Sequence, residues 1–190
     1  MTPAVFFDRD GTLIEEAGYL DRLENLRLFP YTVDALRLVA RAGFKIVIAT
    51  NQSGVALGYF DEAFVHATHR ELAARLEAGG AHFDAAYYCP HHPDARVEAY
   101  RAACGCRKPA PGLALRAADE MGLDLARSWV VGDRWRDVGL AAAVGARGIL
   151  VRTGYGAKEE RESPHLLDGV PVVDNVMGAV SWILEQERGR

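Results

Sequence analysis

Short runs rich in β-branched and aromatic residues alternate with amphipathic stretches along the whole chain. Such a run, bounded by turn-forming residues, is typical of a buried β-strand. The runs predict strands at residues 4–8, 44–50, 85–89, 129–132, 148–152 and 170–173.

The stretches between the strands predict helices, because their apolar residues recur at every third or fourth position. The first helix is expected to begin at Thr32, as its N-terminal cap, and to end at Gly43. The next spans residues 61–78 and stops at two consecutive glycines. Further helices are predicted at 111–122, 135–144 and 177–187, and exposed chain at 159–164 and 187–190.

Alternation of strands with helices predicts parallel pairing and right-handed crossovers. The expected fold is therefore a doubly wound, Rossmann-like α/β domain that takes in residues 1–190 as a single unit. No sizeable insertion interrupts the alternation, apart from one cysteine-containing loop, so a separate cap domain is not expected.

Polar side chains follow four of the predicted strands at the point where each ends. Asp8 and Asp10 follow the first strand, residues 50–53 the second, Lys108 the third with its loop, and Asp133 the fourth. Functional groups of a doubly wound sheet gather outside the carboxyl ends of its strands. We therefore expect these side chains to meet in one site.

Asp8 and Asp10 are separated by one residue at the end of an apolar strand. Two such carboxylates about 4 Å apart repel each other by about 4 kcal/mol at an effective dielectric constant of about 20. A divalent cation offsets this cost, and hard oxygen ligands suit Mg²⁺. Asp133 would supply a third oxygen. The alternative is that the two acids only end a strand and start a turn.

All three cysteines fall within residues 89–106, in the pattern C-x-H, twelve residues, C-x-C. Three thiolates and one imidazole suit a closed, tetrahedral Zn²⁺ site made by Cys89, His91, Cys104 and Cys106. His92 is an alternative to His91, and free thiols in a flexible loop are the alternative to zinc. A metal in this loop would brace the residues that follow it, Arg107 and Lys108.

Composition narrows the class of protein. The chain has 190 residues, 49% of them apolar and 25% charged, with a formal net charge of −4. It has no basic surface signature, so nucleic acid is not an expected partner. No apolar run reaches the about 18 residues needed to cross a membrane, and no secretory signal is apparent. An odd number of cysteines favours a reducing compartment, so we expect a cytoplasmic protein. We also expect a monomer.

The motifs "DRDGT" at 8–12, "ATN" at 49–51, Lys108 before a helix and "GDRWRD" at 132–137 resemble those of the haloacid-dehalogenase-like (HAD) phosphatase superfamily. The resemblance implies that Asp8 is the nucleophile and Asp10 the general acid and base. It implies that Asp8, Asp10 and Asp133 hold Mg²⁺. Thr50 and Lys108 would bind the transferring phosphoryl group. Asp137 either complements the start of the following helix or steadies Lys108 or the metal's waters.

The zinc loop together with "CRKPAPG" and "NQSG" looks like the histidinol-phosphatase-type branch of this superfamily. This resemblance implies a small sugar bisphosphate as substrate, with Arg107 recognising the phosphate that is not cleaved. The other implied contacts are Glu16, Gly18, Tyr19, Thr50, Asn51, Gln52, Ser53 and Lys108. The pair Glu15 and Glu16 departs from the shorter residues usual in the branch, which leaves the sugar open.

Two other functions remain compatible with parts of the pattern. A histidinol-phosphate phosphatase would share the motifs and the zinc loop. A receiver-like phospho-acceptor module also combines a doubly wound domain, an aspartate and Mg²⁺, but its acceptor is expected on a mid-chain strand. A dinucleotide-binding enzyme is not expected, since no G-x-G-x-x-G follows the first strand.

Overall fold

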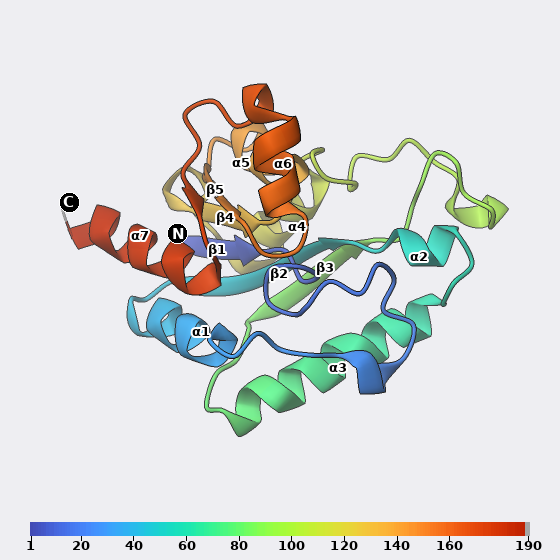
Figure 1. Cartoon of the computed structure of the whole chain (residues 1–190), viewed down its shortest axis with the longest axis horizontal. Helices are drawn as coiled ribbons and strands as arrows, with labels where there is room; N and C mark the ends of the chain where they lie inside the picture. The colour runs from blue at the N-terminus through green and yellow to red at the C-terminus, as the bar shows by residue number, and fades with distance from the viewer. Residues whose placement is uncertain (189–190) are drawn as a thin grey trace.

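The computed structural model describes residues 1–188 and is built on one sheet of six parallel strands (Figure 1). The strands lie in the order β3-β2-β1-β4-β5-β6, and every pair is parallel. They are β1 (Ala4–Phe7), β2 (Lys45–Asn51), β3 (Ala85–Cys89), β4 (Trp129–Gly132), β5 (Arg147–Val151) and β6 (Val172–Val173). The predicted strands and the doubly wound α/β fold are confirmed; β3 and β4 match the predicted bounds, and the ends of the other strands differ by one or two residues.

Helices cover both faces of the sheet. One face packs against α1 (Thr32–Arg41), α3 (Glu62–Ala78) and α7 (Val176–Arg188), and the first two run along the lower side of the sheet in Figure 1. The other face packs against α4 (Gly112–Met121) and α5 (Trp135–Ala143). The short helices are α2 (Ser53–Ala56), α6 (Gly156–Glu162) and 3-10 turns at Leu23–Asn25, Glu98–Tyr100, Leu125–Arg127 and Pro164–Leu166.

The central strand β1 shows why its sequence reads as a continuous apolar run. Val5 and Phe7 belong to the core on the α1 side, whereas Ala4 and Phe6 belong to the core on the α4 side. All four side chains are fully buried. A strand covered on both faces has no polar positions to alternate with.

Two local predictions were wrong. Tyr31, and not Thr32, is the N-terminal cap of α1. The Thr32 hydroxyl instead donates to the carbonyl of Leu13 at 2.8 Å, which ties α1 to the loop after β1. Residues 159–162, predicted as exposed chain, form the second half of α6, which has little apolar periodicity because most of its residues are charged. Of the predicted exposed end at 187–190, the last two residues lie outside the described chain.

Between β1 and β2, the described chain forms only a loop, one 3-10 turn and α1, with no second sheet. Within residues 1–188, none of the helices has the length and apolar character required to span a bilayer.

Candidate active site

A polar cavity of about 290 Å³ opens at the carboxyl ends of β1, β2 and β4. From β1 the chain first builds the β2–β3 side of the sheet and then crosses to β4 on the other side. Such a reversal of direction leaves a crevice at the strand ends, where doubly wound proteins bind their ligands. Most of the predicted site residues line this cavity: Asp8, Asp10, Glu16, Gly18, Tyr19, Thr50, Asn51, Gln52, Ser53, Arg107, Lys108 and Asp133.

Three carboxylates meet at the floor of the cavity. Oxygens of Asp8, Asp133 and Asp137 lie within 4.8 Å of one another. Burial raises the pKa of Asp133, and the negative charges of Asp8 and Asp137 raise it further. A divalent cation would remove this cost, and the oxygen donors are of the kind that Mg²⁺ prefers.

Two glycines shape the backbone around the Asp133 carboxylate. A Cβ at Gly11 or Gly154 would lie 2.3 Å or 2.2 Å from Asp133 Oδ2. Both glycines have a positive φ, which other residues rarely adopt. The same oxygen accepts a hydrogen bond from the Tyr155 N–H at 2.8 Å. The Asp133 carboxylate is therefore held by close backbone contact, with its other oxygen left for a ligand.

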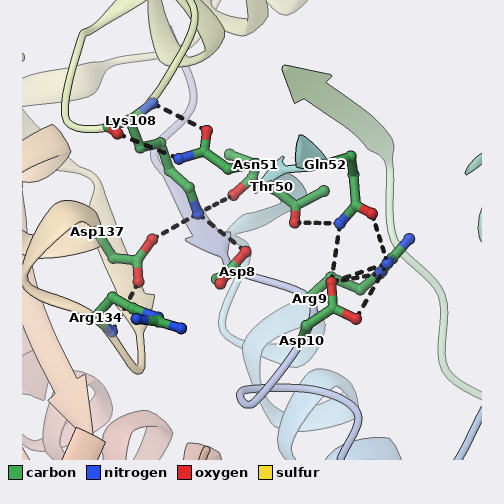
Figure 2. Close-up of polar contacts among 10 residues, drawn as sticks. Asp8, Arg9, Asp10, Thr50, Asn51, Gln52, Lys108, Arg134 and Asp137 are labelled. Carbon is green, nitrogen blue, oxygen red and sulfur yellow. Dashed lines mark hydrogen bonds and ion pairs between the residues drawn. The ribbon is translucent and has the colours of Figure 1, made fainter. Parts of the chain in front are cut away.

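Lys108 is buried between two of these acids (Figure 2). Its Nζ lies 3.0 Å from Asp8 Oδ1, an ion pair without hydrogen-bond geometry, and donates to Asp137 Oδ1 at 2.5 Å and to the Ala49 carbonyl at 2.6 Å. Burial by itself would lower the pKa of Lys108, but the charges of Asp137 and Asp8 outweigh it and raise the pKa. The ammonium group thus stays charged beside Asp8.

Asp137 does both of the things that the sequence left as alternatives. Its Oδ1 binds Lys108, and its Oδ2 accepts from the Arg134 N–H at 3.0 Å at the start of α5. Burial raises the pKa of Asp137 to about 6, against the opposing charge of Lys108. Since both oxygens already have partners in the protein, Asp137 is a positioning residue for Lys108.

The side chain of Asp10 does not join the three carboxylates. It accepts from Arg9 Nε at 3.0 Å and from Gln52 Nε2 at 2.9 Å, and Figure 2 shows it turned toward those two residues. Gln52 also donates to Thr50 Oγ1 at 3.0 Å. The sequence predicted that the side-chain carboxylates of Asp8, Asp10 and Asp133 meet. In the structure, the carboxylate of Asp10 lies apart from the other two.

Asn51 contacts the backbone of Lys108 in both directions. Asn51 Oδ1 accepts from the Lys108 N–H at 3.0 Å, and Asn51 Nδ2 donates to the Lys108 carbonyl at 3.2 Å. The pair fixes the segment that carries Lys108 against the end of β2. Although Asn51 lines the cavity, its amide is occupied by this contact.

The predicted substrate loop forms one wall of the cavity. Glu16 Oε1 accepts from the Gly18 N–H at 2.6 Å, and Gly18 has a φ of 74°. Burial, followed by the nearby charge of Asp10, raises the pKa of Glu16 to about 7. The Tyr19 ring packs against Tyr59, with the centroids 4.5 Å apart.

The cysteine loop forms a compact cluster of four donors. Cys89, His91, Cys104 and Cys106 each offer one atom within 4.8 Å of the others, and the three sulfurs lie 3.1–3.4 Å apart. The cysteines are free, as these distances far exceed a disulfide bond of about 2.05 Å. Sulfurs at about 2.3 Å from a tetrahedral Zn²⁺ would be spaced only slightly wider. The donors thus fit zinc.

His91, and not His92, faces this cluster. His91 Nδ1 lies 3.4 Å from Cys106 Sγ, whereas His92 lines the polar cavity. The carbonyl of His91 also accepts from Arg107 Nη1 at 3.1 Å, and the same nitrogen donates to Ser53 Oγ at 2.8 Å. The donor cluster and the cavity are therefore connected through Arg107.

Several cavity residues were not predicted: Arg9, Phe60, Arg136 and Tyr155. Arg9 lies between Asp8 and Asp10 in the sequence, and this position could have indicated that it belongs to the site. Arg136 lies in the "GDRWRD" motif. Tyr155 follows the fifth strand, and only the folded chain brings its N–H to Asp133.

Comparison with known proteins agrees with this architecture. A family model described as HAD-hydrolase-like matches residues 105–179. The D-glycero-beta-D-manno-heptose-1,7-bisphosphate 7-phosphatase of Escherichia coli is 42% identical over 163 residues, which cover 85% of each chain. The D-glycero-D-manno-heptose-1,7-bisphosphate 7-phosphatase of Thermosynechococcus vestitus is 42% identical over 186 residues, or 95% of each chain.

A solved structure is also similar. The crystal structure of D,D-heptose 1,7-bisphosphate phosphatase from B. bronchiseptica, complexed with magnesium and phosphate, superposes with a TM-score of 0.87 at 32% identity. The match covers 97% of this chain and 99% of that one. With the relatives above, it shows that this chain belongs to the D-glycero-D-manno-heptose-1,7-bisphosphate 7-phosphatase family of HAD-like hydrolases.

Proposed function

We propose that this protein is a Mg²⁺-dependent phosphatase that removes the 7-phosphate of D-glycero-D-manno-heptose 1,7-bisphosphate through an aspartyl-phosphate intermediate. The observation that carries the proposal is the buried contact of Lys108 with Asp8 beside the Asp133 carboxylate. The family to which the chain belongs supports the choice of substrate.

Asp8 and Asp133 would hold the magnesium ion through their carboxylates. Because the Asp10 carboxylate is bound to Arg9 and Gln52, we propose that Asp10 contributes its main-chain carbonyl to the ion. Bound there, the ion would neutralise the phosphate charge that otherwise repels Asp8.

In the first step, an Asp8 oxygen attacks phosphorus and the bond from phosphorus to the sugar oxygen breaks. Asp10, protonated before this step and turned away from Arg9 and Gln52, gives its proton to that oxygen, since a sugar alkoxide is a poor leaving group. Lys108 stabilises the charge that develops on the phosphoryl oxygens, and the Thr50 hydroxyl adds a donor.

In the second step, Asp10 takes a proton from a water molecule that attacks the phosphoryl group on Asp8. The bond between phosphorus and Asp8 breaks, which releases phosphate and restores the Asp8 carboxylate and the protonated form of Asp10. Division of one slow hydrolysis into two displacements is the advantage of a covalent intermediate. Glu16, Gly18, Tyr19, Ser53 and Arg107 would orient the sugar bisphosphate.

The zinc cluster has a structural role in this proposal. Zn²⁺ on Cys89, His91, Cys104 and Cys106 would order the loop at 89–106 and hold Arg107 through the His91 carbonyl. We further propose that the chain works as a single domain and a monomer. Its reduced thiols fit a cytoplasmic location.

The test is phosphate release, with Mg²⁺, from both anomers of the heptose bisphosphate and from histidinol phosphate. We expect the highest kcat/KM for one heptose bisphosphate anomer. We expect Asp8→Asn to abolish release, while Asp34→Asn, an exposed acid on α1, retains it. A preference for histidinol phosphate would reassign the substrate, and no turnover of any ester would leave a receiver-like module as the better interpretation.

A further inference from the structure

The cations that line the cavity differ in whether an acid neutralises them. Three of them have carboxylate partners within 4 Å: Arg9 with Asp10, Lys108 with Asp8 and Asp137, and Arg134 with Glu159. Arg134 also stacks on the Tyr155 ring, 3.5 Å from its centroid. The side chains of Arg9, Lys108 and Arg134 therefore already have partners within the protein.

Arg107 and Arg136 have no such partner among the described residues. Arg107 donates only to neutral groups, the Ser53 hydroxyl and the His91 carbonyl. The Arg136 guanidinium lies over the ring of Trp135, 5.8 Å from its centroid. Both arginines are half-buried and line the same cavity.

The two guanidinium groups act on each other. Burial lowers the pKa of Arg107, and the positive charge of Arg136 is the next largest cause. Two half-buried like charges without a counter-charge disfavour the empty site. A dianion placed between them would reverse the sign of that interaction, and the planar guanidinium fork suits two oxygens of a phosphate.

Arg107 and Arg136 lie apart from the reacting groups, because neighbouring residues in the chain turn to different parts of the site. Lys108 follows Arg107 and turns to Asp8 and Asp137, whereas Arg107 turns to Ser53 and His91. In the same way, Asp137 is buried against Lys108 while the preceding Arg136 stays half-exposed. The cavity therefore has an acidic, metal-binding floor and a separate cationic wall.

We propose that Arg136, together with Arg107, binds the phosphate group of the substrate that is not cleaved, so that Arg136 is a specificity-determining residue. This inference rests on the proposed function, because it needs a substrate with two phosphates. Arg136 selects bisphosphates over monophosphates and takes no part in the displacement at Asp8.

The test compares the heptose 1,7-bisphosphate with the corresponding heptose 7-phosphate, which lacks the second phosphate. We expect Arg136→Gln to lower kcat/KM for the bisphosphate by about 10- to 100-fold, mainly through KM, as loss of a charge-assisted contact predicts. We expect its kcat/KM for the monophosphate to stay within about twofold of the wild type. Arg136→Lys, which keeps the charge without the fork, should lie between the two.

Arg37→Gln is the matched control, since it removes one positive charge from an exposed position on α1. A double mutant of Arg107 and Arg136 should lose less than the product of the two single effects, because both arginines bind one group. Equal losses on both esters in Arg136→Gln, or no loss on either, would overturn the inference while leaving the proposed function intact. If the wild type hydrolyses neither ester, the proposed function itself fails.

Discussion

At the scale of single residues, the site depends on a lysine that stays charged in a fully buried position. Asp137 makes this possible because it accepts a hydrogen bond from Lys108 Nζ at 2.5 Å. The positive charge of Lys108 is thereby shared between Asp137 and Asp8. Without Asp137, Lys108 would pair only with Asp8, the proposed nucleophile. Asp137 thus controls how freely the Asp8 carboxylate can react.

Asp137→Asn is expected to lower kcat by about 100-fold, which is the usual cost of disturbing one stabilising donor. Because the Asp137 charge raises the pKa of Lys108, the loss of activity at alkaline pH should shift to lower pH. The free energy of unfolding should fall by about 3 kcal/mol, since one partner of a buried ion pair is removed. A pH–rate profile and urea unfolding measure these effects, with the exposed Asp34→Asn as control. An unchanged alkaline limb would contradict the positioning role.

The glycine contacts around Asp133 give a second prediction at this scale. Gly154→Ala places a Cβ 2.2 Å from Asp133 Oδ2. We expect the Mg²⁺ concentration for half-maximal phosphate release to rise by about tenfold or more, because metal sites tolerate only small displacements of their ligands. Gly145→Ala is the matched control, since Gly145 also has a positive φ but nothing within 4 Å of the added Cβ. Equal Mg²⁺ requirements in the two variants would refute the effect.

At the scale of elements, the cysteine loop at 89–106 lies between β3 and α4 and leads directly into Arg107. The Gly112 N–H at the start of α4 donates to the Gly105 carbonyl at 2.8 Å, and a Cβ at Gly112 would lie 2.4 Å from that oxygen. The end of the loop is therefore pressed against α4. Zinc would hold its other side through the cysteines and His91.

Cys104→Ser is expected to lose zinc and to raise KM for the bisphosphate more than it lowers kcat, because Arg107 is released while Lys108 keeps its partners. Metal analysis and steady-state kinetics measure both effects. Wild-type protein stripped of zinc by a chelator should behave in the same way, and zinc should restore it. A zinc-free variant with wild-type KM would rule out the bracing role.

At the scale of the whole molecule, the global stability is expected to depend on a histidine behind the site. His69 on α3 is buried, and its Nε2 has no hydrogen-bond partner in the described residues. Burial lowers its pKa to about 3, with a smaller effect from the positive charge of Arg9. An unfolded chain would titrate this ring at about 6.5.

Below pH 6.5 the unfolded state therefore binds a proton that the folded state does not, so the stability contribution is lost as the pH falls. Between pH 7 and pH 5 we expect the wild type to lose about 1–2 kcal/mol more than His69→Gln. Urea unfolding at fixed zinc and magnesium measures the difference. His82→Gln, at an exposed position, should follow the wild type. Parallel losses in all three proteins would argue against the buried neutral ring.

The elements that sequence predicted well are those with a strong local pattern. The strands are apolar on both faces, as in β1, and the end of α4 at Gly122 follows from its left-handed backbone. The pattern failed at α6, where charged residues form a helix without an apolar face to reveal it. It also failed at Thr32, whose hydroxyl donates to the distant Leu13 carbonyl and does not cap the helix.

By itself, the sequence determined that this protein has a parallel sheet and that its acids, lysine and cysteines follow particular strand ends, because periodicity and chain order are local properties. Only the tertiary structure decided which side chains face one another. It turned Asp10 toward Arg9 and Gln52, turned Asp137 toward Lys108, placed His91 and not His92 at the cysteine cluster, and put Arg136 in the same cavity as Arg107. Those choices depend on rotamers and on contacts between distant segments, such as the 2.6 Å hydrogen bond from Thr153 to the Gly11 carbonyl, that no local pattern encodes.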